Sequence, residues 1–149
     1  MAKERYLIDS NILIRWVKPE ESRFALVEKS LRALDLLGVL ACYTSQNLGE
    51  FWNVLTRPCD RNGYGLTAKE ANIRAMDVEA VFRLLPDGPA VHQEWRRLPI
   101  DYRVCGVQVH DARLVASMHV HGVRRILTFN TKDFARFEDI EAIHPAQLI

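Results

Sequence analysis

The sequence has no long apolar stretch, few cysteines and almost no net charge. No apolar run approaches the roughly 20 residues that a membrane-spanning helix needs, so we expect no contact with a membrane. The first residues, MAKERYLID, lack the long apolar core of a secretory signal, and we therefore expect a cytoplasmic protein. The formal net charge of +1 does not by itself argue for a nucleic-acid partner, because the distribution of charge matters more than its sum.

The three cysteines, Cys42, Cys59 and Cys105, are odd in number and irregularly spaced, which argues against a disulfide framework and against a zinc site. We expect them to be reduced and mostly buried. Internal repeats, low-complexity tracts and obvious linkers are also missing. A chain of 149 residues with 48% apolar residues is long enough to bury a sizeable core, and it fits a single domain over residues 1–149.

Strand-like and helix-like segments alternate along the chain. Short apolar runs predict buried strands, and apolar residues at helical spacing, bounded by Gly or Pro, predict helices. The predicted strands cover residues 5–8, 39–43, 81–85, 124–129 and, at the edge, 140–144, and the predicted helices cover about 10–17, 21–37, 45–57, 68–79, 90–98 and 108–121. This alternation predicts a three-layer α/β/α fold around a central parallel sheet of four to five strands.

Asp9, in the stretch YLIDSNILIRW, is a carboxylate between two apolar runs. Burying an ionised carboxylate is costly unless something compensates its charge. In a parallel sheet, ligands bind outside the carboxyl ends of the strands, and Asp9 is expected at that edge. The stretch LTFNTKDF leaves the fourth strand at the same edge and carries Asn130 and Asp133.

Two further acids are expected near this edge. Asp111 opens a predicted helix in QVHDARLVASM, and Glu50 lies in apolar company in SQNLGEFWNVLTRP. Each acid has a simpler explanation when taken alone, as a helix cap, a charge on a helix dipole, a surface pair or a turn residue. Together, however, four neighbouring carboxylates would repel one another and raise their pKa values. A hard divalent cation, Mg²⁺ or Mn²⁺, would relieve that repulsion.

The motifs resemble those of the PIN-domain family, in particular the VapC-like toxin ribonucleases of bacterial and archaeal toxin–antitoxin pairs. Four stretches carry the resemblance, and with the order of elements they span nearly the whole chain: YLIDSNILIRW, TSQNLGEFWNVLTRP, VCGVQVHDARLVASM and RRILTFNTKDFARF. The resemblance implies a PIN-like fold and a metal-dependent endoribonuclease.

The family's acidic positions match Asp9, Glu50 and Asp111, and the fourth is placed at Asp133, although some members carry an acid where this chain has Asn130. Asp9 and Asp111 are then expected to bind Mg²⁺ or Mn²⁺ directly. Glu50 would bind a second ion or orient the attacking water, and Asp133 would complete the shell through water. Two further residues match polar positions that line the family's site, and structural roles for both are equally open: Asn11 and Thr128.

The resemblance also implies an RNA substrate, a cognate antitoxin protein and a homodimer. Clustered basic residues either bind phosphates or form ordinary solvated surface: Arg57, Arg61, Lys69, Arg96, Arg97, Arg103, Lys132 and Arg136. Two tyrosines expected in loops, Tyr64 and Tyr102, are candidates for stacking on bases.

Two other functions remain open from the sequence. Phosphatases with an Asp nucleophile also place an Asp after the first strand, but their pattern needs a second acid two residues later, where this chain has Asn11. A catalytically silent PIN fold that acts as a binding or scaffold module is the second alternative, and the intact acidic positions argue against it.

Overall fold

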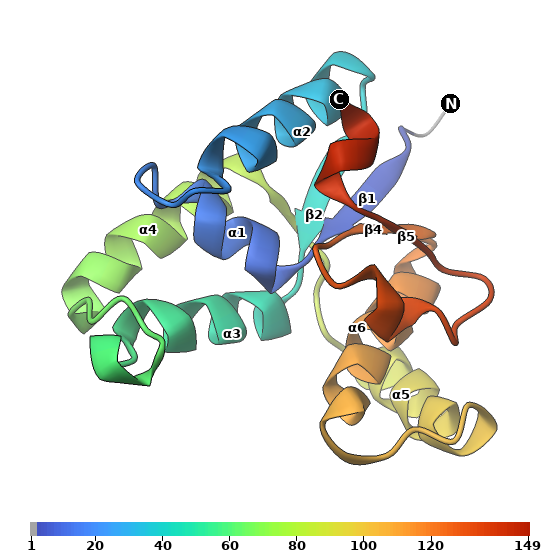
Figure 1. The fold of residues 1–149 in the computed structure, drawn as a ribbon. Coiled ribbons are helices and arrows are strands. Elements are labelled where there is room, and N and C mark those ends of the chain that lie inside the picture. Colours follow the sequence, from blue (N-terminus) through green and yellow to red (C-terminus); the bar gives the residue numbers. More distant parts are fainter. Residues whose placement is uncertain (1–2) are drawn as a thin grey trace.

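A five-stranded parallel sheet forms the centre of the molecule in the computed structural model, which describes residues 3–149 (Figure 1). The order of the strands is β3-β2-β1-β4-β5, and every neighbouring pair is parallel. The strands are β1 (Arg5–Ile8), β2 (Leu40–Tyr43), β3 (Arg83–Leu84), β4 (Arg125–Leu127) and β5 (Glu141–Ile143).

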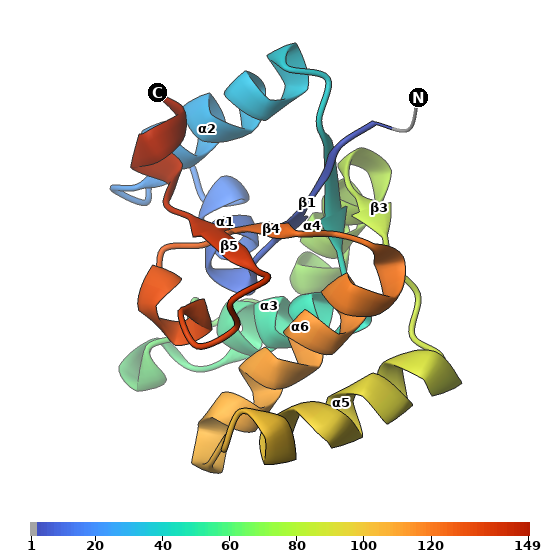
Figure 2. The ribbon, with the colours of Figure 1, turned by 90° about the vertical axis from the view of Figure 1, so that its right-hand side faces the viewer.

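The helices cover both faces of this sheet. They are α1 (Ser10–Trp16), α2 (Phe24–Leu36), α3 (Ser45–Thr56), α4 (Ala68–Val81), α5 (Pro89–Asp101) and α6 (Val109–His121), with short 3₁₀ turns η1 (Cys59–Arg61), η2 (Gly106–Gln108), η3 (Thr131–Phe134) and η4 (Pro145–Leu148). Helices α1 to α4 lie on one side of the strands, and α5 and α6 lie on the other (Figures 1 and 2). The predicted three-layer fold is confirmed.

Alternation along the strands builds two separate cores. In β1, Tyr6 and Ile8 point into the core beneath α1 to α4, whereas Leu7 points into the core beneath α5 and α6. Cys42 and Tyr43 divide in the same way in β2. Because both faces of the sheet are covered, the strands read as continuous apolar runs rather than as alternating ones.

One helix begins, and two helices end, where the sequence predicts a cap or a glycine stop. Thr67 and Glu70 form the expected capping box at the start of α4. Gly38 and Gly122 follow α2 and α6 with φ angles of +75° and +68°, the left-handed conformation in which glycine lacks the steric cost of other residues.

Several predicted boundaries are wrong, and α2, expected from residue 21, begins at Phe24. The third strand was expected over residues 81–85, but α4 continues through Val81 because the Phe82 N–H still bonds to the Val78 carbonyl, 2.9 Å away. Helix α5 was expected to end at Leu98, before Pro99. It runs to Asp101, and the Tyr102 N–H bonds to the Leu98 carbonyl at 2.9 Å, so the proline is accommodated within the last turn.

The cysteine prediction is half right. All three thiols are free, and Cys42 is buried in β2. Cys59 and Cys105 are exposed because neither lies in the sheet. Cys59 is in η1, and Cys105 directly precedes η2. Within residues 3–149, no helix is both long and apolar enough to cross a membrane.

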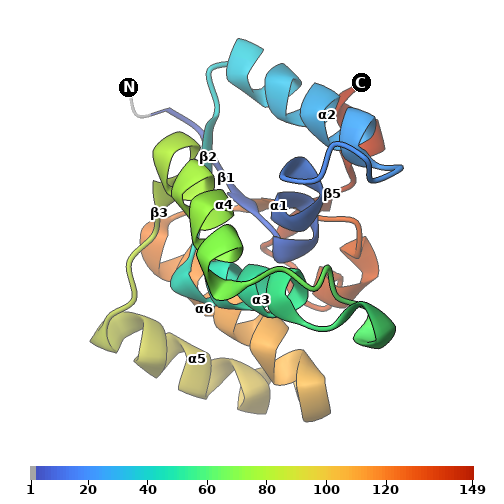
Figure 3. The ribbon, with the colours of Figure 1, turned by 90° about the vertical axis from the view of Figure 1, so that its left-hand side faces the viewer.

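The packing of α1 onto the sheet positions the segment that follows β1, and Figure 3 shows α1 beside α2, α3 and α4. Leu13→Ala is expected to lower the free energy of unfolding by about 2–5 kcal/mol, because this fully buried side chain would leave a cavity. Leu36→Ala is the matched control, since Leu36 is 83% exposed at the end of α2 and its loss should cost less than about 0.5 kcal/mol. Urea unfolding measures both, and equal losses would show that the core assignment is wrong.

Candidate functional site

Asp9 lies where the order of the strands reverses, between the carboxyl ends of β1 and β4. It caps α1, and its side chain is only 8% exposed. Its Oδ1 accepts the Ser10 backbone N–H at 2.7 Å, and its Oδ2 accepts the Thr128 hydroxyl at 2.8 Å. Such a reversal is the usual ligand-binding position in open α/β sheets.

Asn11 and Thr128 tie α1 to the end of β4 beside Asp9. The Asn11 amide donates to the Thr128 hydroxyl oxygen at 3.2 Å and, more weakly, to Asp9 Oδ2 at 3.4 Å. Its Oδ1 accepts the Phe129 N–H at 3.3 Å, and Thr128 also accepts the Asn130 N–H at 3.0 Å. Both residues therefore contact the site and also hold the backbone around it.

Glu50 faces the same region from α3. Its Oε1 accepts the Ser10 hydroxyl at 2.8 Å, so the residue after Asp9 also contacts the second acid. Ser10 in turn accepts the Asn47 side-chain amide at 3.2 Å. Neither Ser10 nor Asn47 was expected at the site. The sequence does show Ser10 next to Asp9, and it shows the three-residue spacing between Thr44 and Asn47, which form a capping box.

Asp111 lies in the first turn of α6, and Asp133 lies in η3 beyond β4. Both side chains are half-buried. The negative charge of Asp133 acts on both Asp9 and Asp111, whereas Asn130 is exposed and contributes its backbone N–H to Thr128. All four acids expected from the sequence are thus close enough to influence one another electrostatically, and Asp133 rather than Asn130 supplies the fourth charge.

Two of the four acids, Asp9 and Asp111, have raised pKa values. Burial is the main cause that raises the pKa of Asp9 from 3.8 to about 6; hydrogen bonds from Thr128 and Ser10 oppose it, and the charges of Glu50 and Asp133 add to it. Burial and then repulsion by the other three acids raise the pKa of Asp111 from 3.8 to about 7, and Arg136 partly offsets the rise. The site therefore has an excess of negative charge.

The donor set fits a hard divalent cation. Carboxylate oxygens are among the ligands that Mg²⁺ and Mn²⁺ prefer, and the pKa values of Asp9 and Asp111 stay raised although hydrogen bonds and Arg136 partly offset the rise. Within residues 3–149, however, no three His, Cys, Asp or Glu side chains converge closely enough to form a complete metal-binding group. The acids are near enough to repel one another without meeting at one point.

The basic residues differ in their surroundings. Arg97 is paired within α5 with Glu94 at 2.7 Å and with Asp101 at 2.5 Å. Arg136 donates to the Gln108 side chain and, at 3.5 Å, to the Tyr102 carbonyl, and its charge reaches Asp111. Of the candidate basic residues, Arg136 has the clearest electrostatic link to the site.

The two tyrosines are packed rather than free to stack on bases. The Tyr64 ring lies against the core, and the Lys18 ammonium is 3.8 Å from its centroid. The Tyr102 ring packs on Phe137 with the ring centroids 5.0 Å apart. A role for these rings in RNA stacking is not favoured.

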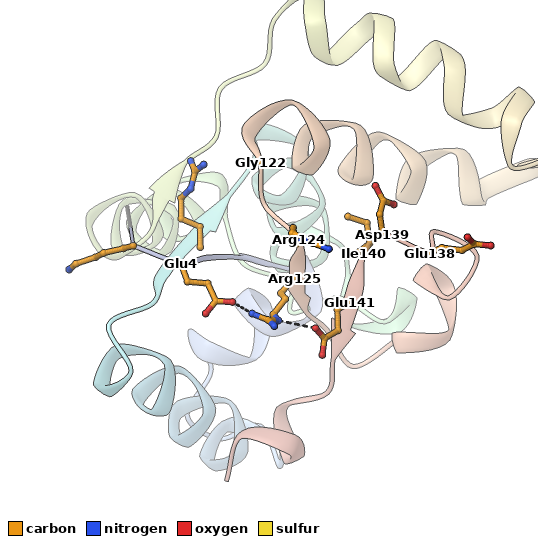
Figure 4. A pocket seen from close by; sticks show the side chains of 10 residues that line it. Glu4, Gly122, Arg124, Arg125, Glu138, Asp139, Ile140 and Glu141 are labelled. Carbon is orange, nitrogen blue, oxygen red and sulfur yellow. Dashed lines mark hydrogen bonds and ion pairs between the residues drawn. The ribbon is translucent and has the colours of Figure 1, made fainter. Parts of the chain in front are cut away.

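The opposite edge of the sheet carries a different charge pattern. A hollow of about 680 Å³ lies there, where β1, β4 and β5 begin (Figure 4). Arg125 forms ion pairs with Glu4 and, at 2.9 Å, with Glu141, so acids and bases neutralise each other across the three strands. At this edge, unlike at the carboxyl edge, the acids Glu4 and Glu141 are paired with a base.

Comparisons with known proteins agree with this geometry. A family model described as PIN domain matches residues 6–140. No curated protein matches the sequence.

Solved structures share the fold at low sequence identity. VapBC2 from Rickettsia felis, bound to a promoter DNA fragment, is 12% identical with a TM-score of 0.69, over 94% of this chain and 98% of that one. VapC20 from Mycobacterium tuberculosis is described as a toxin that cleaves the sarcin–ricin loop. It is 16% identical with a TM-score of 0.66, over 89% of this chain and 95% of that one. A toxin–antitoxin complex from Klebsiella pneumoniae is 18% identical with a TM-score of 0.64, over 94% of this chain and 97% of that one.

Asp111→Asn is expected to stabilise the metal-free protein at pH 8. Because the folded-state pKa of Asp111 is raised, the folded chain binds more protons than the unfolded chain between pH 3.8 and about 7, and stability falls as the pH rises through that window. The neutral asparagine avoids this penalty, which is on the order of 2 kcal/mol once the conversion of about 1.4 kcal/mol per pKa unit is halved for solvent screening of this partly exposed group.

Urea unfolding in EDTA measures the effect. The advantage of the variant should shrink towards pH 4, where the wild-type carboxyl is protonated in the folded state. A variant that is no more stable than the wild type at pH 8 would contradict the raised pKa.

Proposed function

This chain belongs to the PIN domain family, and we propose that within it the protein is a divalent-metal-dependent endoribonuclease, the toxin component of a toxin–antitoxin pair. One observation carries the proposal: a buried Asp9 with its pKa raised to about 6, at the reversal of the strand order, with Glu50, Asp111 and Asp133 near enough for their charges to interact with it. A fold does not need such a cluster for stability, because like charges in one place destabilise it.

Each acid has a separate role in this proposal. Asp9 and Asp111 would hold the ion directly, since their proton affinities are the ones that their surroundings raise. Glu50, which accepts the Ser10 hydroxyl, would orient the attacking water or hold a second ion. Asp133 would contribute to the site through water. A bound Mg²⁺ or Mn²⁺ would lower the pKa of a coordinated water and neutralise charge on the scissile phosphate.

RNA is the proposed substrate. VapC20, which has the same fold, is described as cleaving the sarcin–ricin loop, an RNA. In this chain Arg136, oriented by Gln108 and by the Tyr102 carbonyl, lies on the Asp111 side of the site and is suited to bind a flanking phosphate. Lys132, exposed in η3 next to Asp133, adds a second positive charge.

An antitoxin is the proposed protein partner, because several structures with this fold are toxin–antitoxin complexes, among them FitAB bound to DNA. We also propose that residues 1–149 form one domain and that the protein lies in the cytoplasm. The resemblance further implies a homodimer.

Asp9→Asn is expected to reduce metal-dependent RNA cleavage at least about 100-fold, since even changes that touch a metal only indirectly cost about 10- to 100-fold. Asp77→Asn, on the exposed face of α4, is the matched control and should cleave like the wild type. Gel assays with structured RNAs in Mg²⁺ and in Mn²⁺ measure the rates. Undiminished cleavage by folded Asp9→Asn would overturn the assignment, and inactivity of the wild type on all RNAs together with a tight protein partner would favour a binding module.

Mn²⁺ or Mg²⁺ is expected to raise the melting temperature of the wild type. A ligand that binds only the folded state adds about 2.7 kcal/mol at 100 times its Kd, which for a chain of this size corresponds to roughly 5–10 °C. Differential scanning fluorimetry with and without EDTA tests this. Asp9→Asn should lose the shift and Asp77→Asn should keep it, whereas an equal shift in both variants would place the ion elsewhere.

A further inference from the structure

A buried chain of polar side chains links Glu50 to the beginning of its own helix. The Ser10 hydroxyl donates to Glu50 Oε1 at 2.8 Å, the Asn47 amide donates to Ser10 Oγ at 3.2 Å, and Asn47 Oδ1 accepts both the N–H and the hydroxyl of Thr44, each at 2.9 Å. Asn47 is fully buried, Thr44 is 1% exposed and Ser10 is 7% exposed. Burying polar groups to this extent requires that they be hydrogen-bonded, as they are here.

The orientation of the Asn47 side chain is determined by its neighbours. A backbone N–H can only donate, so the Asn47 atom facing the Thr44 N–H has to be the oxygen. The amide nitrogen therefore faces Ser10, and because it can only donate, it fixes Ser10 Oγ as the acceptor in that contact. The Ser10 proton is then directed to the Glu50 carboxylate.

Ser10 holds two of the four acids at once. Its backbone N–H binds Asp9 Oδ1 at 2.7 Å, and its hydroxyl binds Glu50 Oε1. The spacing between these carboxylates thus depends on one residue, and the direction of its hydroxyl depends on Asn47.

Capping of α3 does not account for the whole Asn47 side chain. The capping box uses its oxygen, which accepts the Thr44 N–H, and its backbone N–H, which donates to Thr44 Oγ1 at 3.1 Å. In the equivalent box of α4, Glu70 fulfils the same role with carboxylate oxygens alone. The amide nitrogen of Asn47 is not needed for the cap, and its hydrogen bond is made to Ser10.

We propose that Asn47 is a positioning residue for the metal site: it orients the Ser10 hydroxyl, which holds Glu50 at a fixed place relative to Asp9. This inference rests on the proposed function and adds a residue outside the four acids. Removing the Asn47 amide leaves the Ser10 hydroxyl free to rotate away from Glu50, so that the carboxylate loses its fixed orientation.

The test compares Asn47→Ala, Ser10→Ala, the double variant and Ser10→Thr with the wild type. Mn²⁺ affinity is measured by isothermal titration calorimetry, and kcat and KM are measured for RNA cleavage. Asn47→Ala is expected to weaken Mn²⁺ binding and to lower kcat by about tenfold each, the usual effect of losing an outer-shell contact, with the KM for RNA unchanged. Ser10→Thr, which keeps the hydroxyl, should retain both values.

Non-additivity is the distinguishing result. If Asn47 acts through Ser10, the double variant should be no worse than Ser10→Ala in Mn²⁺ affinity or kcat. Glu70→Ala, which removes the corresponding cap residue of α4 far from the acids, controls for lost capping and should reduce only stability.

Two failures are separable. The inference alone is overturned if the wild type binds Mn²⁺ and cleaves RNA but Asn47→Ala matches Glu70→Ala in metal affinity and kcat. Fully additive losses in the double variant would also overturn it. A wild type that neither binds Mn²⁺ nor cleaves RNA would overturn the proposed function, and the inference with it.

Discussion

The burial of carboxylates that also repel one another, at one edge of the sheet, is the constraint on which the rest of the structure depends. Asp9 is buried between β1 and β4, and the hydrogen bonds from Thr128 and Ser10 do not compensate its burial fully, so its pKa is raised to about 6. Asp111, at about 7, shares this excess charge. Folding around such a cluster lowers the free energy of unfolding. A cation that binds there offsets the negative charges, and this stabilises the folded state.

The two edges of the sheet show the same residue types used in opposite ways. At the amino edge, Arg125 pairs with Glu4 and Glu141, and the charges cancel between strands (Figure 4). At the carboxyl edge, the charge of Arg136 only partly offsets the raised pKa of Asp111. The parallel arrangement makes this division possible, because all five strands deliver their carboxyl ends, and the segments that follow them, to one side.

Much of this arrangement was predictable from the sequence, for definite physical reasons. Short apolar runs and the Gly38 and Gly122 stops gave the alternation of strands and helices, and the position of Asp9 after an apolar run gave the edge of the sheet. The strand order was not predictable, because pairing depends on contacts between distant segments. Helix α5 passes Pro99, and the Tyr102 N–H still bonds to the Leu98 carbonyl beyond it, so the proline did not mark the end of the helix. Asn47 and Ser10 were missed at the site because their role lies in hydrogen bonds across α1 and α3, and the spacing from Thr44 to Asn47 indicates only a cap.

The most direct test of the central claim is an anomalous difference map from crystals of the wild-type protein soaked in Mn²⁺. We predict a peak between the carboxylates of Asp9 and Asp111, with carboxylate oxygens as ligands and Glu50 adjacent through its own oxygen or a bound water. Mn²⁺ found only elsewhere, such as in the charged hollow beside Arg125, or a site between the two aspartates that stays empty at saturating Mn²⁺, would contradict the account.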